Sequence, residues 1–544
     1  MRPVFAAAAL ALALPAGADA ARFAVGVAPG ANVERLGAAV EWRTGGTVEP
    51  LAPFAFVLEA RDARGIARLP GVAYVERLEG RGRRLAFTPN DPLAPRQWHL
   101  QAVNAFRAWA QRPTLPGMRV AVIDSGIDAG HPEFPAGRIA AARSFVGGSA
   151  RSDLQGHGTF IAGLIAASLN NGEGIAGMAF PAQLLVAKVV RSDGVVPLEA
   201  EARAIRWAVD NGARVINLSL GGIRDPQDAS RDGFSRLEAS AVAYAVRKGV
   251  IVVAAVGNGD QAPEQPWRYA SYPAALPHVL GVSAMARDGS VPAFSNRDPI
   301  YNDIAAPGDE LFSTLPRGLT ALNPSCDAQG YSECGPSEYR RAQGTSFAAA
   351  VVSAGAVLVR ASWPVLRAGQ IVSLIERTAT DMTPATGCRR CTDGRDATSG
   401  WGRLDVAAAV EYAGRFAAVD FFETNDNAGE RAMPVRSKRA VNLRASVDFW
   451  DDPNDVYAIR LRRGGRLVAT LSQSDDPVDV VLWKPGTRRI EDVRSLNVVR
   501  QSKPVGTSGV EVVRYRASKA GIYYLHVKIP EPGATPYLLR IVRR

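Results

Sequence analysis

Apolar residues form regular blocks along the middle of the chain. Continuous apolar runs predict strands that are buried on both faces, at 119–124, 183–190, 213–220, 249–256 and 278–284. Helical patterns lie between these runs, at 156–168, 197–212 and 235–249, and the last two end in Gly, a frequent helix terminator. The alternation predicts an α/β fold with a central parallel sheet, helices on both faces and reactive groups at the carboxyl ends of the strands.

The pattern changes on either side of this block. Residues 21–86 mix apolar alternation with Gly and Pro, which predicts a small α+β domain that ends in a basic run at 81–84. From about 416 the chain turns to short β-runs, and 455–472 predicts a hairpin around Gly464-Gly465. With two further strands in 520–542, we expect a separate antiparallel β-sandwich after a linker near 415–440.

The first residues predict a secretory signal peptide, 1–20. Arg2 supplies a positive start, "FAAAALALAL" an apolar stretch too short to span a bilayer, and "ADA" at 18–20 a small-residue cleavage site. A short buried helix is the alternative interpretation. No later apolar run reaches membrane-spanning length without a charge, so we expect a soluble protein secreted to the periplasm or the extracellular medium.

Length, composition and charge narrow the class of protein. The 544 residues allow three or four domains, and 47% hydrophobic with 22% charged residues is typical of a globular protein, not a disordered one. The net charge of +11 would suit a nucleic-acid partner. Because Arg is spread along the whole length, we expect a solvated basic surface and no nucleic-acid binding.

The cysteines are four in number and lie as two local pairs, Cys326 with Cys334 and Cys388 with Cys391. Disulfides suit an exported protein, whereas four thiolates with a C-x-x-C could also bind zinc. The spacing around Cys326 is not that of a zinc ribbon, which favours disulfides. Pairing within each local couple is one of three connectivities.

Candidate bases near neutral pH are few, because the chain has five histidines. His99, His278 and His526 lie in apolar or strand contexts and fit structural roles. His131 follows a turn and fits a turn cap. His157 opens a pattern interpreted as an amphipathic helix, with Gly on both sides, so its imidazole can stand clear of neighbouring side chains. It is either a structural residue or, with a nucleophile and an orienting carboxylate, a catalytic base.

Three other residues lie at the ends of predicted strands or helices, where reactive groups of an α/β fold are expected. Asp124 ends the first apolar run, and a buried carboxylate there either anchors the next turn or orients a histidine. Ser346 precedes a long small-residue run, as a helix N-cap or as a nucleophile at the positive end of that helix. Asn258 is a turn residue in an Asn-Gly step or a donor to an oxyanion.

Five stretches together carry a family resemblance. "AVIDSGIDAGHPEF", "GHGTFIAG", "INLSLGG", "VVAAVGNG" and "GTSFAAAVVSAG" resemble the subtilisin-like serine proteases over roughly 90–415, in the chain order Asp, His, Ser. The resemblance implies Asp124 as orienter, His157 as general base and acid, Ser346 as nucleophile and Asn258 as oxyanion donor. Ser346 would then cap its helix and also be the nucleophile.

The resemblance also implies how substrate is held. Ser219, Leu220, Gly221 and Gly222 would line the cleft and pair with an extended peptide as an added strand. The base of the main specificity pocket would come from 259–270, where Asp260 and Glu264 either make the pocket acidic or face solvent. The chain departs from the family at Phe347 and Ala350, where Met and Pro are usual, and neither change removes a catalytic group.

Calcium enters only through the resemblance. The stretch 169–177, with Glu133, is similar to a region that binds structural calcium in relatives, and it offers oxygen ligands. Catalysis itself would need no cofactor.

The flanking segments resemble accessory domains of such proteases. Residues 21–86, through "LPGVAYVE", resemble an inhibitory propeptide that assists folding, inhibits its own enzyme and is cut away within 82–91. Residues 416–544 resemble a bacterial pre-peptidase C-terminal domain through "FETNDNAGERA", "NDVYAIRL" and "AGIYYLHV". The peptidase domain would then be 87–415.

We therefore expect a secreted, monomeric serine endopeptidase that hydrolyses protein or peptide substrates through an acyl-enzyme. A protein of another class is the alternative: a catalytically silent scaffold that the sandwich attaches to a surface. A transpeptidase, in which an amine displaces water from the acyl-enzyme, is a third reading that no residue favours.

Overall fold

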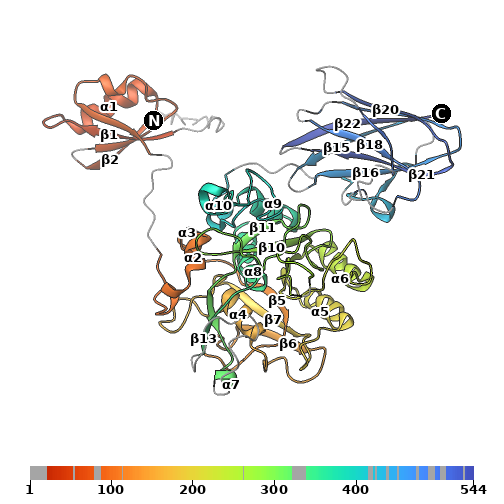
Figure 1. Ribbon diagram of the computed structural model, residues 1–544. Helices are drawn as coiled ribbons and strands as arrows, with labels where there is room; N and C mark the ends of the chain where they lie inside the picture. Colours follow the sequence, from red (N-terminus) through yellow and green to blue (C-terminus); the bar gives the residue numbers. More distant parts are fainter. Residues whose placement is uncertain are drawn as a thin grey trace, which may run out of the picture. The chain divides into compact units, whose positions relative to one another are not determined.

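The structure, a computed structural model, is shown in Figure 1. It describes residues 21–52, 55–78, 87–112, 114–260, 262–320, 338–413, 421–422, 425–436, 440–449, 452–472, 474, 477–487, 490, 497–502, 510–530 and 533–544. The signal peptide expected at 1–20, the basic run at 81–84, and Cys326 with Cys334 lie outside these residues. The chain divides into two compact units, one up to Leu85 and one from Ala86 onward.

The N-terminal unit is a four-stranded antiparallel sheet with one helix, as the α+β prediction required. The strand order is β2-β3-β1-β4, and the helix packs on β2 and β3. The elements are β1 (Ala21–Val27), α1 (Val33–Thr44), β2 (Thr47–Ala52), β3 (Ala55–Ala60), the 3-10 turn η1 (Ile66–Arg68) and β4 (Val72–Arg77). Helix α1 begins at Asn32, whose side chain accepts from the Arg35 amide, and ends at Gly45 in the left-handed region.

The second unit contains the parallel sheet that the apolar runs predicted. In spatial order its seven strands are β11 (Ile304–Pro307), β10 (Val279–Met285), β9 (Ile251–Ala255), β8 (Val215–Leu218), β5 (Met118–Asp124), β7 (Ala182–Lys188) and β6 (Ile139–Ser144). Every predicted run contains a strand. The sequence did not single out β6 and β11, which form the two edges and are short or half exposed.

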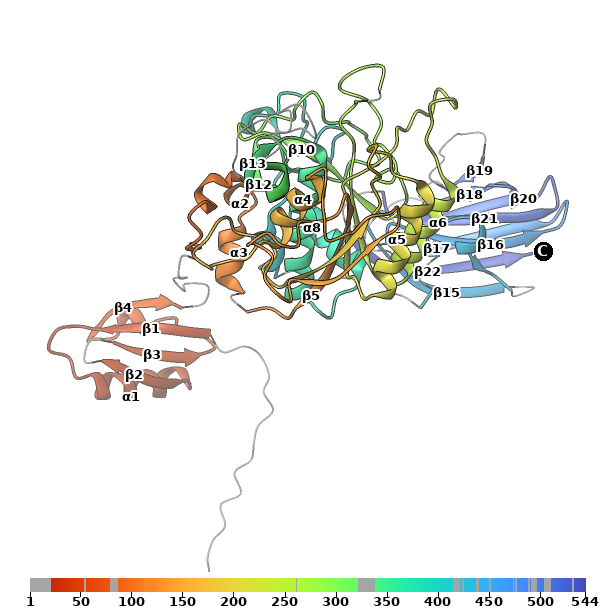
Figure 2. The ribbon, with the colours of Figure 1, turned by 90° about the horizontal axis from the view of Figure 1, so that it is seen from below.

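Helices cover both faces of this sheet, and Figure 2 shows α4 with α8 and α5 with α6 on opposite sides. One core contains α4 (His157–Ala166) and α8 (Thr345–Ser362), and the other contains α5 (Leu198–Asp210) and α6 (Arg236–Arg247). The fold class is therefore confirmed. The expected amphipathic character of α4 is wrong, because every residue after its first is buried.

The long helix α8 lies in the centre of the larger core. Among the described residues it is the one helix long and apolar enough to cross a membrane, and 83% of that segment is buried inside the fold. It contacts β8, β9, β10 and β11, so it sets the position of its own first turn against the ends of these strands. Smaller elements complete the region: η2 (Ala94–Arg96), α2 (Trp98–Ala102), α3 (Ala105–Gln111), β12 (Leu311–Thr314), α7 (Arg317–Thr320), β13 (Tyr339–Ala342), α9 (Ala368–Arg377), η4 (Pro384–Thr386) and α10 (Val406–Val410).

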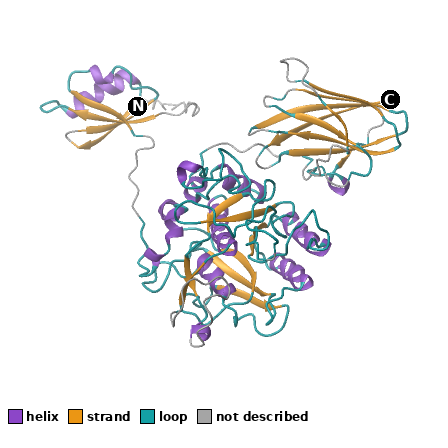
Figure 3. Ribbon diagram, in the orientation of Figure 1, coloured by secondary structure: helices purple, strands orange, loops and turns teal. Residues whose placement is uncertain are grey.

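The C-terminal part consists of two sheets, coloured in Figure 3 almost wholly as strand and loop. The strand orders are β14-β16-β21-β18-β19 and β15-β22-β17-β20, and all pairs are antiparallel except β14 with β16. Two such sheets fit a β-sandwich. The elements are η5 (Gly429–Arg431), β14 (Met433–Pro434), β15 (Ala440–Asp448), β16 (Asn454–Leu461), β17 (Arg466–Ser472), β18 (Asp479–Trp483), β19 (Val498–Gln501), β20 (Glu511–Arg516), β21 (Gly521–Lys528) and β22 (Ala534–Arg543).

The hairpin predicted at 455–472 is wrong. Both strands exist, but β16 pairs with β21 and β17 pairs with β20 and β22, in the opposite sheet. The turn at Gly464 therefore crosses from one layer to the other. Both strands bury alternate residues in the shared core, such as Ile459 and Ala469, and alternation alone does not distinguish a hairpin from such a crossing.

Candidate active site

The predicted acid and base meet at the carboxyl end of β5. His157 Nδ1 lies 2.9 Å from Asp124 Oδ1 and 3.0 Å from Oδ2. Asp124 is only 2% exposed, and its Oδ1 also accepts a hydrogen bond from the Ser125 amide at 2.7 Å. Because the carboxylate only accepts, the neutral imidazole carries its proton on Nδ1 and leaves Nε2 with a lone pair.

A second carboxylate fixes the start of α4, and the sequence reasoning missed it. Asp153 accepts from the amides of Gly156 and Thr159, both at 2.9 Å, and so holds the first turn of the helix. It also accepts from the Ser125 hydroxyl at 2.9 Å, and that oxygen accepts from the Gly158 amide. The signal in the sequence was an Asp just before a helix start, a common capping arrangement.

The charge of the two carboxylates decides the proton affinity of His157. Burial disfavours the charged ring and would lower its pKa, but the charge and hydrogen bond of Asp124, with a contribution from Asp153, outweigh it. The pKa of His157 is therefore raised above its ordinary value. An imidazolium formed during proton transfer would be stabilised where it forms.

Ser346 is the second residue of α8, with Gly344 as the N-cap and no side-chain cap present. The expectation that Ser346 caps its helix is therefore wrong. Gly344 has φ 151°, a backbone that favours glycine, and this places the helix start at the sheet edge. Ser346 Oγ donates to the Ser219 carbonyl at 3.2 Å, and among the described residues no hydrogen bond joins it to His157. The ring of the next residue, Phe347, lies 5.4 Å from the imidazole ring.

The Asn258 side chain is oriented by the same helix start. Its Oδ1 accepts from the Thr345 amide at 2.9 Å and from the Thr345 hydroxyl at 2.8 Å. Because a backbone N–H only donates, the oxygen and nitrogen of the amide are assigned without ambiguity. Asn258 Nδ2 is then the donor end of this side chain, and Asn258 lines one pocket together with Thr345 and Ser346.

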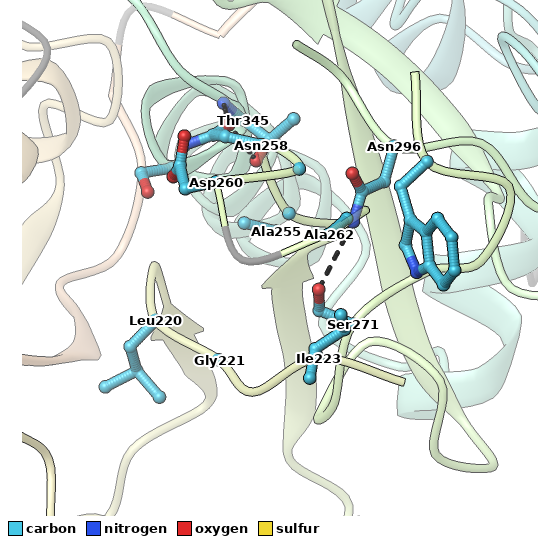
Figure 4. A pocket seen from close by; sticks show the side chains of 14 residues that line it. Leu220, Gly221, Ile223, Ala255, Asn258, Asp260, Ala262, Ser271, Asn296 and Thr345 are labelled. Carbon is cyan, nitrogen blue, oxygen red and sulfur yellow. Dashed lines mark hydrogen bonds between the residues drawn. The ribbon is translucent and has the colours of Figure 1, made fainter. Parts of the chain in front are cut away.

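A pocket of about 210 Å³, partly open to solvent, adjoins Ser346 and Asn258. Figure 4 shows Asn258 and Asp260 on one side of it and Asn296 with Ser271 on another. Leu220 and Gly221 also line the pocket, whereas Ser219 contacts the Ser346 backbone instead, with its Oγ 2.6 Å from the Ser346 oxygen.

The structure corrects one expectation about this pocket and decides between two alternatives for its acidic residues. Gly222 cannot pair with a peptide, because its N–H and C=O are both bonded to Tyr272 at 2.9 Å. Glu264 does not line the pocket but pairs at the surface with Arg268 at 2.8 Å, whereas Asp260 does line it. The pocket floor also includes residues beyond 259–270, namely Ser271 and Asn296, which lie on separate loops and were not predicted.

The family departures near Ser346 are accommodated by packing. Phe347 is 1% exposed and its ring packs 4.6 Å from Phe160, so it supports the imidazole from the α4 side. Ala350 is buried in the continuous α8, where a proline would have removed a helix hydrogen bond.

The remaining histidines lie away from this site. His131 Nδ1 accepts from the Glu133 amide at 3.2 Å, in line with a turn cap, and His99 is fully buried with its pKa lowered by burial to about 3. His526 Nε2 bonds Asn454 at 2.8 Å within the sandwich. Cys388 and Cys391 are joined by a disulfide.

The stretch associated with calcium has its carboxylates engaged by hydrogen-bond donors. Glu133 Oε1 accepts from the Ile175 amide at 2.7 Å and the Tyr339 hydroxyl at 3.0 Å, and Asp91 accepts from the amides of Asn170 and Asn171. Within the described ranges no three His, Cys, Asp or Glu side chains gather to hold a metal. Burial raises the pKa of Glu133 to about 7. These residues do not form a carboxylate cage for a cation.

Several known proteins are similar to this chain. The model of the Subtilase family matches residues 116–402. Thermitase of Thermoactinomyces vulgaris is 37% identical over 238 residues, which are 43% of this chain and 78% of thermitase. Subtilisin DY of Bacillus licheniformis is 32% identical over 282 residues, 52% of this chain and 90% of that protein. A solved protease structure from Pseudoalteromonas arctica PAMC 21717 covers 60% of this chain and 99% of its own, with 28% identity and a TM-score of 0.48.

Proposed function

This chain belongs to the subtilase family and is a serine-type endopeptidase, and from that premise we propose that it cleaves peptide bonds through an acyl-enzyme on Ser346. The observation that carries the proposal is the Asp124–His157 pair, at 2.9 Å, with Nε2 of the same ring left to accept a proton. Asp124 orients the ring, His157 is the base and Ser346 the nucleophile.

The first half of the reaction forms the acyl-enzyme. Ser346 Oγ gives up its hydrogen bond to Ser219 and turns toward the imidazole. His157 Nε2 takes the hydroxyl proton as Oγ bonds to the substrate carbonyl carbon, and the carbonyl oxygen becomes negative. Asn258 Nδ2 and the Ser346 amide donate to that oxygen. The C–N bond then breaks, and His157 returns the proton to the leaving amine.

The second half releases the acid product. Water takes the place of the amine and gives a proton to His157 Nε2 as its oxygen bonds to the acyl carbon. The tetrahedral species collapses, Ser346 Oγ leaves and regains the proton. Structural calcium stays a prediction of the resemblance alone.

The substrate is proposed to lie along the edge at 219–221. Leu220 and Gly221 border the pocket, so an extended peptide paired with this backbone would bring its carbonyl carbon to Ser346 and one side chain into the pocket. We further propose that the protein is secreted, that residues 21–86 act as its propeptide, and that residues 416–544 form an accessory domain.

The test is substitution of the nucleophile. Ser346→Ala should lower turnover of a casein-like substrate by several orders of magnitude, roughly the effect of removing a member of such a triad. Ser362→Ala is the matched control: Ser362 lies at the far end of the same helix, where its hydroxyl donates to the Leu358 carbonyl, and the variant should keep full activity.

A fluorophosphonate probe provides a second measurement. It should label Ser346 in the processed protein and leave the alanine variant unlabelled. Full activity of Ser346→Ala, or labelling at another residue, would refute the proposal. Processed protein without any labelling would favour the silent scaffold.

A further inference from the structure

The pocket beside Ser346 contains hydrogen-bond acceptors and one negative charge. Of the described residues that line it, Asp260 alone is charged, and its side chain is exposed to solvent. We propose that this pocket selects substrates with a basic residue, Lys or Arg, on the acyl side of the scissile bond. The inference rests on the proposed function and names its substrate class.

The orientation of Asn296 supports this assignment. Its Nδ2 donates to the Val256 carbonyl at 2.9 Å and to Ser271 Oγ at 3.3 Å, the second bond being drawn in Figure 4. Because the Val256 carbonyl only accepts, the amide cannot be flipped, and Oδ1 must point the other way. Asn296 Oδ1 is buried and has no partner in the described part of the chain. An unpaired buried acceptor is costly, and a donor group from a ligand would relieve that cost.

Two glycines keep the acceptor within reach of the pocket. A Cβ on Gly257, which has φ 100°, would lie 2.4 Å from Ser271 Oγ and 2.6 Å from Asn296 Nδ2, so a side chain there would displace both groups. A Cβ on Gly259, which has φ 70°, would lie 3.1 Å from Gln265 Cγ and 3.4 Å from Asn296 Oδ1, so a side chain there would crowd this end of the pocket. With glycine at both positions, the polar end of the pocket stays open to a long side chain.

The walls suit the apolar stem of such a side chain. Trp267 is 5% exposed, and its indole N–H is already donated to the Arg224 carbonyl at 3.0 Å, so it presents only ring surface. Ile223 and Ala262 add aliphatic surface. Lys and Arg bury methylene groups along apolar walls while their charged ends reach polar groups. A Glu or Asp side chain of the substrate would instead be repelled by Asp260 and would face hydrogen-bond acceptors. The described residues that line the pocket include no cation to pair with it.

The experiment compares peptides that differ at this one position. Matched p-nitroanilide substrates carry Lys, Arg, norleucine, Phe or Glu on the acyl side. Norleucine has nearly the length of Lys without its charge, so the ratio of kcat/KM for Lys over norleucine isolates the charge. We expect this ratio to be about tenfold or more, with Glu the poorest substrate. A ratio at or below one overturns the inference.

Variants in one loop test the cause. Asp260→Asn should reduce the Lys-to-norleucine ratio about fivefold, the scale of a partly exposed ion pair, and Asp260→Lys should reverse the order of Lys and Glu. Glu264→Gln is the matched control, because this carboxylate lies in the same loop but pairs with Arg268, and it should leave the ratio unchanged. Equal loss for Lys and norleucine in Asp260→Asn would contradict the inference.

The outcomes separate this inference from the proposed function. If Phe or norleucine substrates are cleaved faster than Lys and Ser346 is labelled, the pocket assignment alone fails. If no substrate is cleaved and Ser346 is not labelled by a fluorophosphonate, the proposed function fails with it. Thermal unfolding of each variant should match the parent, which ensures that the ratios report recognition.

Discussion

Two buried aspartates, one in the parallel sheet and one in the sandwich, have opposite surroundings. Asp124 ends β5 and pairs with His157, which keeps 14% of its side chain exposed and has no bonded partner at Nε2 in the described ranges. Asp455 lies in β16, fully buried, and accepts from Asn425 and from the Tyr537 hydroxyl, which itself contacts Tyr457 at 2.7 Å.

The two networks differ in whether the last side chain of the hydrogen-bond network is buried or partly exposed. The Asp455 network closes on buried tyrosines, and burial, with the nearby Asp455 charge, raises the pKa of Tyr537 well above its usual range. Such a network holds one arrangement of the core. The Asp124 network instead ends at the partly exposed imidazole of His157, whose ring lies 5.4 Å from that of Phe347, the residue after Ser346. A buried acid is therefore a candidate for chemistry when its chain of hydrogen bonds reaches a cleft.

The largest effect should follow from disrupting the open network. Asp124→Asn keeps the shape of the side chain but no longer fixes the proton on His157 Nδ1. We expect kcat/KM on a peptide substrate to fall roughly ten-thousandfold, the known scale for a wrongly held tautomer, with little change in thermal unfolding. A fall of less than tenfold would show that Asp124 is only a turn anchor.

A pair of buried carboxyls, one in α5 and one in α6, extends the comparison to two acids that face each other. Glu201 and Glu238 are each 2% exposed. Burial raises the pKa of both carboxyls. The pKa of Glu238 rises to about 7, although its hydrogen bond with Glu201 lowers it in part. The pKa of Glu201 rises further, because the charge of Glu238 adds to the effect of burial. Both pKa values are higher in the folded state than in the unfolded state. The contribution of this pair to the free energy of unfolding is therefore fully present below the unfolded-state pKa of 4.5 and is lost as pH rises through about 7.

Removing one of these carboxyls should flatten that dependence. Between pH 5 and pH 8 the native protein should lose about 3 kcal/mol through Glu238 alone, at about 1.4 kcal/mol per pKa unit, and more through Glu201. Glu238→Gln should unfold at nearly the native temperature at pH 5 and at a higher temperature at pH 8. An unfolding temperature that depends on pH as steeply in Glu238→Gln as in the native protein would contradict this assignment.

The closed network in the sandwich should respond in stability and not in turnover. Asp455→Asn leaves one oxygen to accept from two donors, Asn425 and Tyr537, and we expect a loss of about 2 kcal/mol in denaturant unfolding. Turnover by the folded protein should stay at the native level. A loss of turnover comparable to that of Asp124→Asn would overturn the distinction between the two networks.

The smallest effect concerns the second carboxylate near His157. Activity requires the neutral ring, so kcat/KM should fall as pH drops through a value above 6.5, the ordinary pKa. Asp153→Asn removes a negative charge that raises this pKa, so the acid limb of the pH profile should move down by less than about one unit. If the acid limb of the pH profile does not move in Asp153→Asn, the role of Asp153 is only to hold the start of α4.

The sequence predicted well what depends on local pattern. The five buried strands, the three helices between them and the pairing of Asp124 with His157 are all present. The edge strand β6 escaped because its alternation is weak, and the hairpin at Gly464 was wrong because pairing partners depend on distant strands. Ser346 as a helix cap was wrong because Gly344 sets the helix start two residues earlier.

What the sequence determined by itself was the parallel α/β class and the residue types available for acyl transfer, because apolar periodicity and strand-end polar residues are local properties. Only the tertiary structure decided which polar residues share the pocket. Ser271 and Asn296 are 25 residues apart and meet by one hydrogen bond. Asp260 and Glu264 lie in one loop yet face different surroundings. The direction of a side chain in a loop is set by the strands and helices packed around it, and no local pattern encodes that packing.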